Sequence, residues 1–228
     1  MSLAPATIDS PNCHTATITQ QLSHGAGPDV TLRNETHSGR HRRLGYVRPV
    51  TDILIRPFVA GDADAVRRVV SAAFHPGNEA ELVERIRASD HYVAAMELVA
   101  VEGGEIIGHV MVSGTSITDH TGDTSTISML SPLAVSPERQ RQGIGGTLVR
   151  AVSEIADRSG EPLIVLEGDP AYYSRLGFVP AATLGIDMPL PDWAPPEAAQ
   201  VLCLSSYDPS DVRLHGRVTY SPAFDGFS

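Results

Sequence analysis

Three glycines, Gly143, Gly145 and Gly146, stand between an apolar run and the start of a predicted helix. The first turn of a helix has backbone N–H groups without partners inside the helix, and the helix dipole favours negative charge there. Gly143 and Gly145 lack a Cβ, so a phosphate can approach the backbone and either residue can adopt positive φ. Arg141 adds positive charge, and Arg139 is a second candidate. The loop is therefore predicted to bind a phosphate; glycines that only break the chain between strand and helix are the alternative.

The loop does not match the glycine fingerprint of dinucleotide-binding proteins. That fingerprint needs a third glycine where this chain has Leu148, and an acidic residue about 20 positions later, where Glu167 lies slightly too far. The loop also follows the fourth predicted strand, whereas the fingerprint opens the fold. A different phosphate-bearing ligand is therefore expected.

Pro132 lies inside the strand that leads into this loop. Proline cannot donate a hydrogen bond to a neighbouring strand, so it indicates a bulge or an opened edge. An opened edge would leave free N–H and C=O groups from Leu133 to Val135, which could pair with an amide-bearing ligand as if it were another strand. Phosphates at the helix end and amides along the strand together describe the pyrophosphate and pantetheine of coenzyme A.

Two segments carry a resemblance to a known family. "SPLAVSPERQRQGIGGTLVRAV" resembles motif A of the GCN5-related N-acetyltransferase (GNAT) superfamily, and "VLEGDPAYYSRLGFVPA" resembles its later strand–helix segment. The version with Gly-Asp-Pro and a tyrosine pair is similar to a bacterial branch of predicted acetyltransferases. The resemblance covers roughly residues 52–222. It implies an α/β (α+β) fold of the acyl-CoA N-acyltransferase type, with a mixed, mostly antiparallel twisted sheet and a splayed central strand pair.

The resemblance also implies roles for individual residues. Backbone amides of the splayed strand bind pantetheine and the acetyl carbonyl, which here maps to Leu133, Ala134 and Val135. The motif that binds the pyrophosphate adds seven residues to this expected cofactor-binding set: Gln140, Arg141, Gln142, Gly143, Ile144, Gly145 and Gly146. A tyrosine four residues before the glycine of "LGF" acts as general acid for the departing thiolate, and that residue is Tyr173. A packing role is expected for its neighbour Tyr172.

The sequence does not single out a general base. Family members that use a strand glutamate have it where "TSTISML" here has no carboxylate. Glu81, Glu167, His109 and His91 are all candidates, but each has a structural explanation as well; for Glu81 it is a capping box with Asn78. A water chain, or an amine that arrives neutral, would make a dedicated base unnecessary. We therefore assign none.

The function expected from the resemblance is transfer of an acetyl group from acetyl-CoA to a primary amine. The acceptor could be a small molecule, an amino acid or a protein N-terminus. The alternative is a non-catalytic acyl-CoA-binding sensor or interaction module on the same fold. No metal-ligating cluster is present in the sequence pattern, so no metal is expected. A homodimer is left open.

Composition narrows the choice further. The net charge is −10 and the chain contains no lysine, which excludes a Walker A loop and Schiff-base or pyridoxal chemistry. An acidic chain argues against nucleic-acid binding and suits a cationic amine. No run approaches the roughly 18 apolar residues of a membrane span, and the first residues do not form a secretory signal. Cys13 and Cys203 form neither a disulfide framework nor a zinc site. A cytoplasmic protein is expected.

The chain divides into a polar extension, residues 1–50, and a predicted domain, residues 51–228. The extension has no sustained periodicity and is expected to be poorly ordered. In the domain, hydrophobic spacing predicts two helices after a first strand; Asp62 and Asn78 are their expected N-caps. Strands on both sides of Gly103-Gly104 form an expected hairpin. The hairpin is followed by a fourth strand over 124–135, a helix over 145–159 and a strand over 162–168. A short helix ending at Gly177 and two strands over 199–207 and 216–224 complete the predicted domain.

Overall fold

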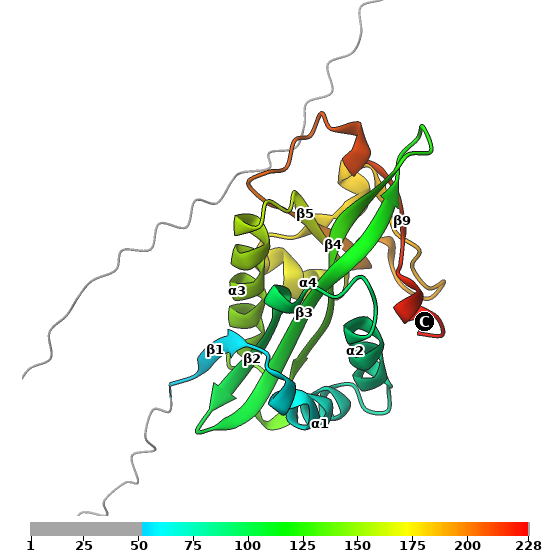
Figure 1. Cartoon of the computed structure of the whole chain (residues 1–228). Helices are drawn as coiled ribbons and strands as arrows, with labels where there is room; N and C mark the ends of the chain where they lie inside the picture. Colours follow the sequence, from blue (N-terminus) through cyan, green and yellow to red (C-terminus); the bar gives the residue numbers. More distant parts are fainter. Residues whose placement is uncertain (1–51, 228) are drawn as a thin grey trace, which may run out of the picture. The chain divides into compact units, whose positions relative to one another are not determined.

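The structure, a computed structural model, describes residues 52–227 of the 228-residue chain (Figure 1). The predicted extension over residues 1–50 lies outside the described residues. The described part forms a mixed sheet in the order β1-β2-β3-β4-β5-β8-β6, with β9 pairing β3 and β7. Its strands are β1 (Leu54–Pro57), β2 (Glu97–Glu102), β3 (Glu105–Thr118), β4 (Thr124–Val135), β5 (Leu163–Glu167), β6 (Val179–Pro180), β7 (Ile186–Asp187), β8 (Ala199–Cys203) and β9 (Gly216–Thr219).

Helices cover both faces of this sheet (Figure 1). They are α1 (Ala63–Ala73), α2 (Glu79–Arg87), α3 (Ile144–Arg158) and the short α4 (Pro170–Tyr173). None of the helices in the described part of the chain is both long and apolar enough to cross a membrane. The element order and the mostly antiparallel pairing confirm the predicted fold class, since only β4–β5 and β7–β9 pair in parallel. The two-residue strands β6 and β7 were not predicted, because two residues carry no periodicity.

The alternation of side chains along each strand separates the core into layers. Leu98 and Val110 point to one face, where they pack with Leu148 of α3. Val99 and Met111, their neighbours in sequence, point to the other face and pack under α1 and α2. A third apolar cluster on β4, β5 and β8 lies under the C-terminal segments. The strand pair β4–β5 is therefore packed on both sides, and any opening between these strands leads into the centre of the domain.

The predicted bulge and the predicted splayed strand pair are both confirmed. Pairing of β3 with β4 jumps from Val110↔Leu133 to Val112↔Leu130, which leaves two residues of β4 opposite Met111. Pairing of β4 with β5 is limited to two residue pairs and stops at Met129. Beyond Met129 the two strands diverge, so the edge of β4 that faces β5 has no strand partner among residues 52–227 up to its end at Val135. Pro132 lies within this opened stretch.

The predicted capping box at the start of α2 is wrong. The Asn78 side chain makes no capping hydrogen bond, although its carbonyl accepts from the Glu81 N–H at 2.8 Å. The Glu81 carboxylate turns along the helix instead and accepts from Arg85 at 2.7 Å, because a guanidinium one turn away is a stronger donor than a backbone N–H. Asp62 does precede α1 as predicted. Its carboxylate, however, accepts from the Val59 N–H and does not cap α1.

Candidate active site

The first turn of α3 has the form of an anion site. Gly143 occupies the N-cap position with φ of +84°, the left-handed conformation that favours glycine. No side chain in the described part of the protein caps this end, and the first turn contains no acidic residue. Inside the helix the first N–H groups have no partners. The predicted loop therefore presents free donors at the positive end of a 15-residue helix.

The loop glycines have different roles. A Cβ on Gly143 would meet nothing within 4 Å, so this glycine is required for its backbone conformation and for open approach. A Cβ on Gly145 would lie 2.6 Å from the Tyr172 hydroxyl, so Gly145 makes room for that side chain. The Gly146 Cβ would find only ordinary contacts, the nearest at 3.4 Å. Ile144 is buried in the core, and its backbone alone can face a ligand.

The polar side chains of the loop are partly engaged by the protein itself. Arg139 forms an ion pair with Glu102, so its charge is already compensated and it is a poor candidate for phosphate binding. Gln140 Nε2 donates to the Val135 carbonyl at 3.1 Å, which ties the loop to the end of β4. Gln142 donates to the Glu138 carbonyl at 3.3 Å. Arg141 is exposed and has no ion-pair partner among residues 52–227.

The opened edge of β4 leads from this loop into a cavity of about 1220 Å³. Leu133 lines the cavity, whereas Ala134 points to the opposite face and is buried under α1 and α2. The Ala134 and Val135 positions can therefore contribute through backbone groups only, and the Val135 carbonyl is already an acceptor for Gln140. The remaining walls come from distant segments: 74–82, 129–133, 167–173, 189–198 and 220–227.

Tyr173 lines this cavity together with the opened part of β4. Its ring packs edge-on against Phe178, at 5.5 Å between centroids, and no hydrogen bond joins its hydroxyl to another residue of the described chain. Burial, and to a lesser degree the neighbouring Tyr172, raises the pKa of Tyr173 well above that of an ordinary phenol. The hydroxyl is therefore protonated at any physiological pH. Tyr172 points to the first turn of α3 instead, as its contact with Gly145 shows.

Of the four candidate bases, only Glu167 lines the cavity. It ends β5, and its carboxylate accepts a hydrogen bond from the Tyr220 hydroxyl. Desolvation by the surrounding chain raises the pKa of Glu167, and the bond from Tyr220 offsets part of that effect. Glu81 is held by Arg85 on the surface of α2. His109 and His91 both lie outside the cavity lining.

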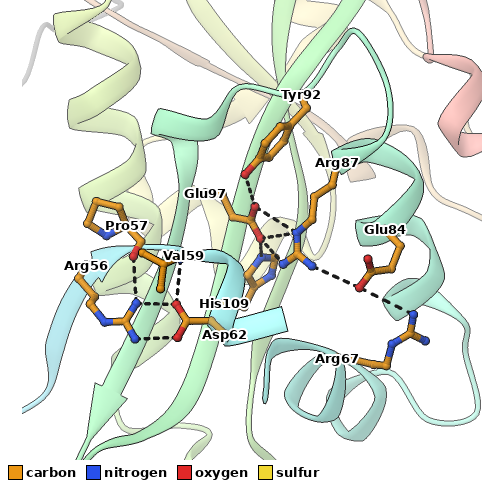
Figure 2. Close-up of polar contacts among 10 residues, drawn as sticks. All are labelled: Arg56, Pro57, Val59, Asp62, Arg67, Glu84, Arg87, Tyr92, Glu97 and His109. Atoms are coloured by element: carbon orange, nitrogen blue, oxygen red, sulfur yellow. Dashed lines mark hydrogen bonds and ion pairs between the residues drawn. The ribbon is translucent and has the colours of Figure 1, made fainter. Parts of the chain in front are cut away.

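His109 instead belongs to a buried polar network that sequence analysis did not identify (Figure 2). Its Nε2 lies 2.9 Å from Oε1 of Glu97, and neither side chain is exposed. Arg87 at the end of α2 and the hydroxyl of Tyr92 also bond to the Glu97 carboxylate, the latter at 2.7 Å. Arg87 stacks on the Phe58 ring as well. The network joins α2 to β2 and β3. The signal for it was an ionisable residue at the centre of an apolar strand, "IIGHVMV".

The described residues contain no group of three or more His, Cys, Asp or Glu side chains arranged to hold a metal ion. The groups that line the cavity and could take part in chemistry are the open edge of β4, the protonated phenol of Tyr173 and carboxylates, and the first turn of α3 lies nearby.

Known proteins are similar to this chain in sequence and in fold. A family model for the acetyltransferase (GNAT) domain matches residues 89–180. The N-acetyltransferase YhbS of Escherichia coli, itself described as uncharacterized, is 31% identical over 130 residues, which cover 57% of this chain and 75% of YhbS. The chain belongs to the GNAT family of acetyltransferases. A second uncharacterized N-acetyltransferase of E. coli, YjhQ, is 33% identical over 121 residues, or 53% of this chain and 66% of YjhQ.

Solved structures of the GNAT family agree over most of the described chain. The crystal structure of E. coli YhbS in complex with CoA superposes with a TM-score of 0.70 at 29% identity, covering 81% of this chain and 98% of YhbS. A GNAT acetyltransferase from Brucella melitensis in complex with acetyl-CoA gives a TM-score of 0.60 at 32% identity, covering 77% of this chain and 99% of that protein. The family resemblance, the fold class and the acetyltransferase class predicted from the sequence are confirmed.

Proposed function

We propose that this GNAT protein binds acetyl-CoA and transfers its acetyl group to a primary amine. The observation that carries this proposal is that two sets of backbone donors lie close together beside one cavity: the β4 edge lines the cavity at Leu133, and a Cβ on Gly145 of α3 would lie 3.6 Å from the Leu133 side chain. One set is the uncapped first turn of α3 behind left-handed Gly143, and the other is the free edge of β4 up to Val135. The similar proteins crystallised with CoA or acetyl-CoA support the assignment of both sets to this cofactor.

In this proposal, each predicted residue has a defined role. The N–H groups from Gly143 to Gly146 bind the pyrophosphate, and exposed Arg141 supplies the compensating charge. The free edge of β4 pairs with the amides of pantetheine, as an added strand would. A backbone N–H on that edge polarises the acetyl carbonyl, which stabilises the oxyanion formed during attack.

The reaction places the thioester between the acceptor amine and Tyr173. The free amine attacks the carbonyl carbon, the C–S bond breaks, and the departing thiolate takes a proton from the Tyr173 hydroxyl. The amide nitrogen loses a proton in the same sequence, which restores the phenol through solvent. The raised pKa of Tyr173 does not prevent this transfer, because the same desolvation also raises the basicity of a thiolate in the cleft. Holding both reactants in one cavity supplies much of the acceleration.

Two measurements on the full chain test the proposal. Calorimetric titration with acetyl-CoA is expected to show binding at one site, and release of free thiol is expected to depend on an added amine. Binding without amine-dependent thiol release would leave only a non-catalytic acyl-CoA-binding module. Absence of binding would contradict the assignment of the α3 loop and the β4 edge. The cytoplasmic location and the bacterial origin stay predictions from the sequence.

A further inference from the structure

The part of the cavity beyond Tyr173 is lined by aromatic side chains and lacks positive charge. The aromatic residues in this part of the lining are Phe74, Trp193, Tyr220, Phe224 and Phe227. No arginine or histidine lines the cavity in the described part of the chain, and the chain contains no lysine. Trp193 stands at 81% exposure, which is unusual for a side chain of this size and suits a surface that meets a ligand.

Three carboxylates line the same cavity, and two of them already have a structural role. Asp169 caps α4 by accepting from the Ala171 N–H at 2.9 Å. Glu79 is the first residue of α2, where the helix dipole stabilises its negative charge. Glu167 belongs to no helix, and its one hydrogen-bond partner among the described residues is the Tyr220 hydroxyl. Glu79 Oε2 is buried and has no hydrogen-bond partner in the described chain, so Glu79 is a second candidate. Glu167 is the more exposed of the two and is the carboxylate that we assign to the ligand.

The surroundings of Glu167 favour a cation over a second anion. Aromatic faces attract an ammonium group, and the carboxylates add to that attraction. A ligand carboxylate, in contrast, would lie among three acidic groups without an arginine to pair with, and it would lose water on entry. Desolvation raises the pKa of Glu167, and an ammonium ion bound beside the carboxylate would lower that pKa again.

We propose that the acceptor is a primary amine on an aromatic or otherwise apolar body without a carboxylate, that Glu167 binds it as the ammonium ion, and that the nitrogen gives up one proton to solvent before the free amine attacks the thioester. The inference rests on the proposed acetyl transfer and narrows its acceptor class. It excludes free α-amino acids, because their carboxylate is bonded to the same carbon as the nitrogen and would therefore lie close to the carboxylates that line the cavity. Tyr220 is a positioning residue in this arrangement, because its hydroxyl holds the Glu167 carboxylate and does not itself meet the ammonium.

The test compares amines that differ only in the carboxylate. We expect 2-phenylethylamine and phenylalanine methyl ester to be acetylated with a kcat/KM at least tenfold above that of phenylalanine, and tryptamine to exceed tryptophan by the same factor. Glu167→Gln should raise the KM for 2-phenylethylamine at least tenfold and leave the Kd for acetyl-CoA unchanged. Glu167→Asp should restore part of the loss, because it keeps the charge. Glu154→Gln, an exposed carboxylate on α3, is the matched control and should behave as the parent.

The outcomes distinguish failure of the proposed acceptor class from failure of the proposed acetyl transfer. If acetyl-CoA does not bind, the proposed function fails. If it binds and the amino acids are used as well as the amines, or no member of either pair is acetylated, the acceptor class is overturned while the cofactor assignment stands. If Glu167→Gln does not fold, Tyr220→Phe provides the second variant, with a smaller rise in KM expected. An unchanged KM in both variants would overturn the role of Glu167.

Discussion

The carboxylate of Glu97 and the imidazole of His109 face each other across β2 and β3, with Oε1 2.9 Å from Nε2 and no solvent exposure of either side chain (Figure 2). Burial lowers the pKa of His109, so the ring is neutral and Nε2 donates to the carboxylate. The negative charge of Glu97 is then balanced by Arg87 alone. The ion pair is therefore the only charge compensation that the described network offers this buried carboxylate.

We expect Glu97→Gln to destabilise the domain by about 3 kcal/mol, because it removes the buried member of the pair and leaves Arg87 with only the half-exposed Glu84 as an anionic partner in the described chain. Denaturant unfolding of parent and variant measures the difference. Glu84→Gln is the control, since that carboxylate also contacts Arg87 but is 40% exposed. Its loss should stay below about 0.5 kcal/mol. Equal losses in the two variants would show that burial of the pair does not matter.

Tyr173→Phe should lower kcat for acetyl transfer by about tenfold to a hundredfold or more, the usual range for loss of a general acid. The ring and its packing against Phe178 are kept, so the Kd for acetyl-CoA should not change. Tyr172→Phe is the matched control, because its hydroxyl lies beside Gly145 of α3 and Tyr172 is not among the residues that line the cavity. A larger loss of kcat in the Tyr172 variant would assign the acid to the neighbour, and an unaltered kcat in both would remove Tyr173 from the mechanism.

Gly143→Val should raise the Kd for acetyl-CoA at least tenfold, because a β-branched side chain opposes the left-handed backbone and blocks the approach of the pyrophosphate. Part of the effect is backbone strain, which costs about 1 to 2 kcal/mol of stability. Gly104→Val separates the two effects. Gly104 has φ of +88° and open space around it, but it lies in the β2–β3 turn. Calorimetry should show weaker binding for Gly143→Val only; matching affinities would contradict the phosphate loop.

Asp62 makes the stability of the domain depend on pH. The Arg56 guanidinium, at 2.6 Å, and the Val59 N–H hold the pKa of Asp62 below its ordinary value of about 3.9. The unfolded chain therefore takes up this proton at a higher pH than the folded chain, and stability falls as pH falls through this window. Asp62→Asn should cost about 1 to 3 kcal/mol at pH 7, the range for hydrogen bonds to a charged group.

The difference between the parent and Asp62→Asn should shrink as the pH falls below about 4, where both chains carry a neutral side chain at this position. Thermal unfolding across pH 3 to 7 measures it. Asp64→Asn is the control, because Asp64 is exposed in the first turn of α1 and has no ion pair in the described chain. A constant difference for Asp62→Asn at every pH would show that the ion pair with Arg56 contributes nothing.

Local signals in the sequence predicted most of the fold. Pro132 predicted the bulge, Gly103-Gly104 the hairpin, and Gly143 the left-handed start of α3, because each of these features depends on the backbone of one or two residues. Residue type did not reveal the network around Glu97, since its partners come from α2 and from strands that only the folded sheet brings together. The sequence predicts that Gly145 gives access to a phosphate, whereas in the structure Gly145 makes room for the Tyr172 hydroxyl. This contact could not be predicted, because Tyr172 follows Gly145 by 27 positions in the sequence.

The walls of the cavity come from segments that are far apart in the sequence and are therefore synthesised at different times. The opened edge of β4 ends at Val135, whereas Tyr220 and Phe227 follow only after β9 begins. Arg85 then fastens this last segment to α2, by a bond to the Asp225 carbonyl at 2.8 Å and by stacking on Phe227. The proposed cofactor loop is thus synthesised about 75 residues before the last walls of the proposed acceptor pocket.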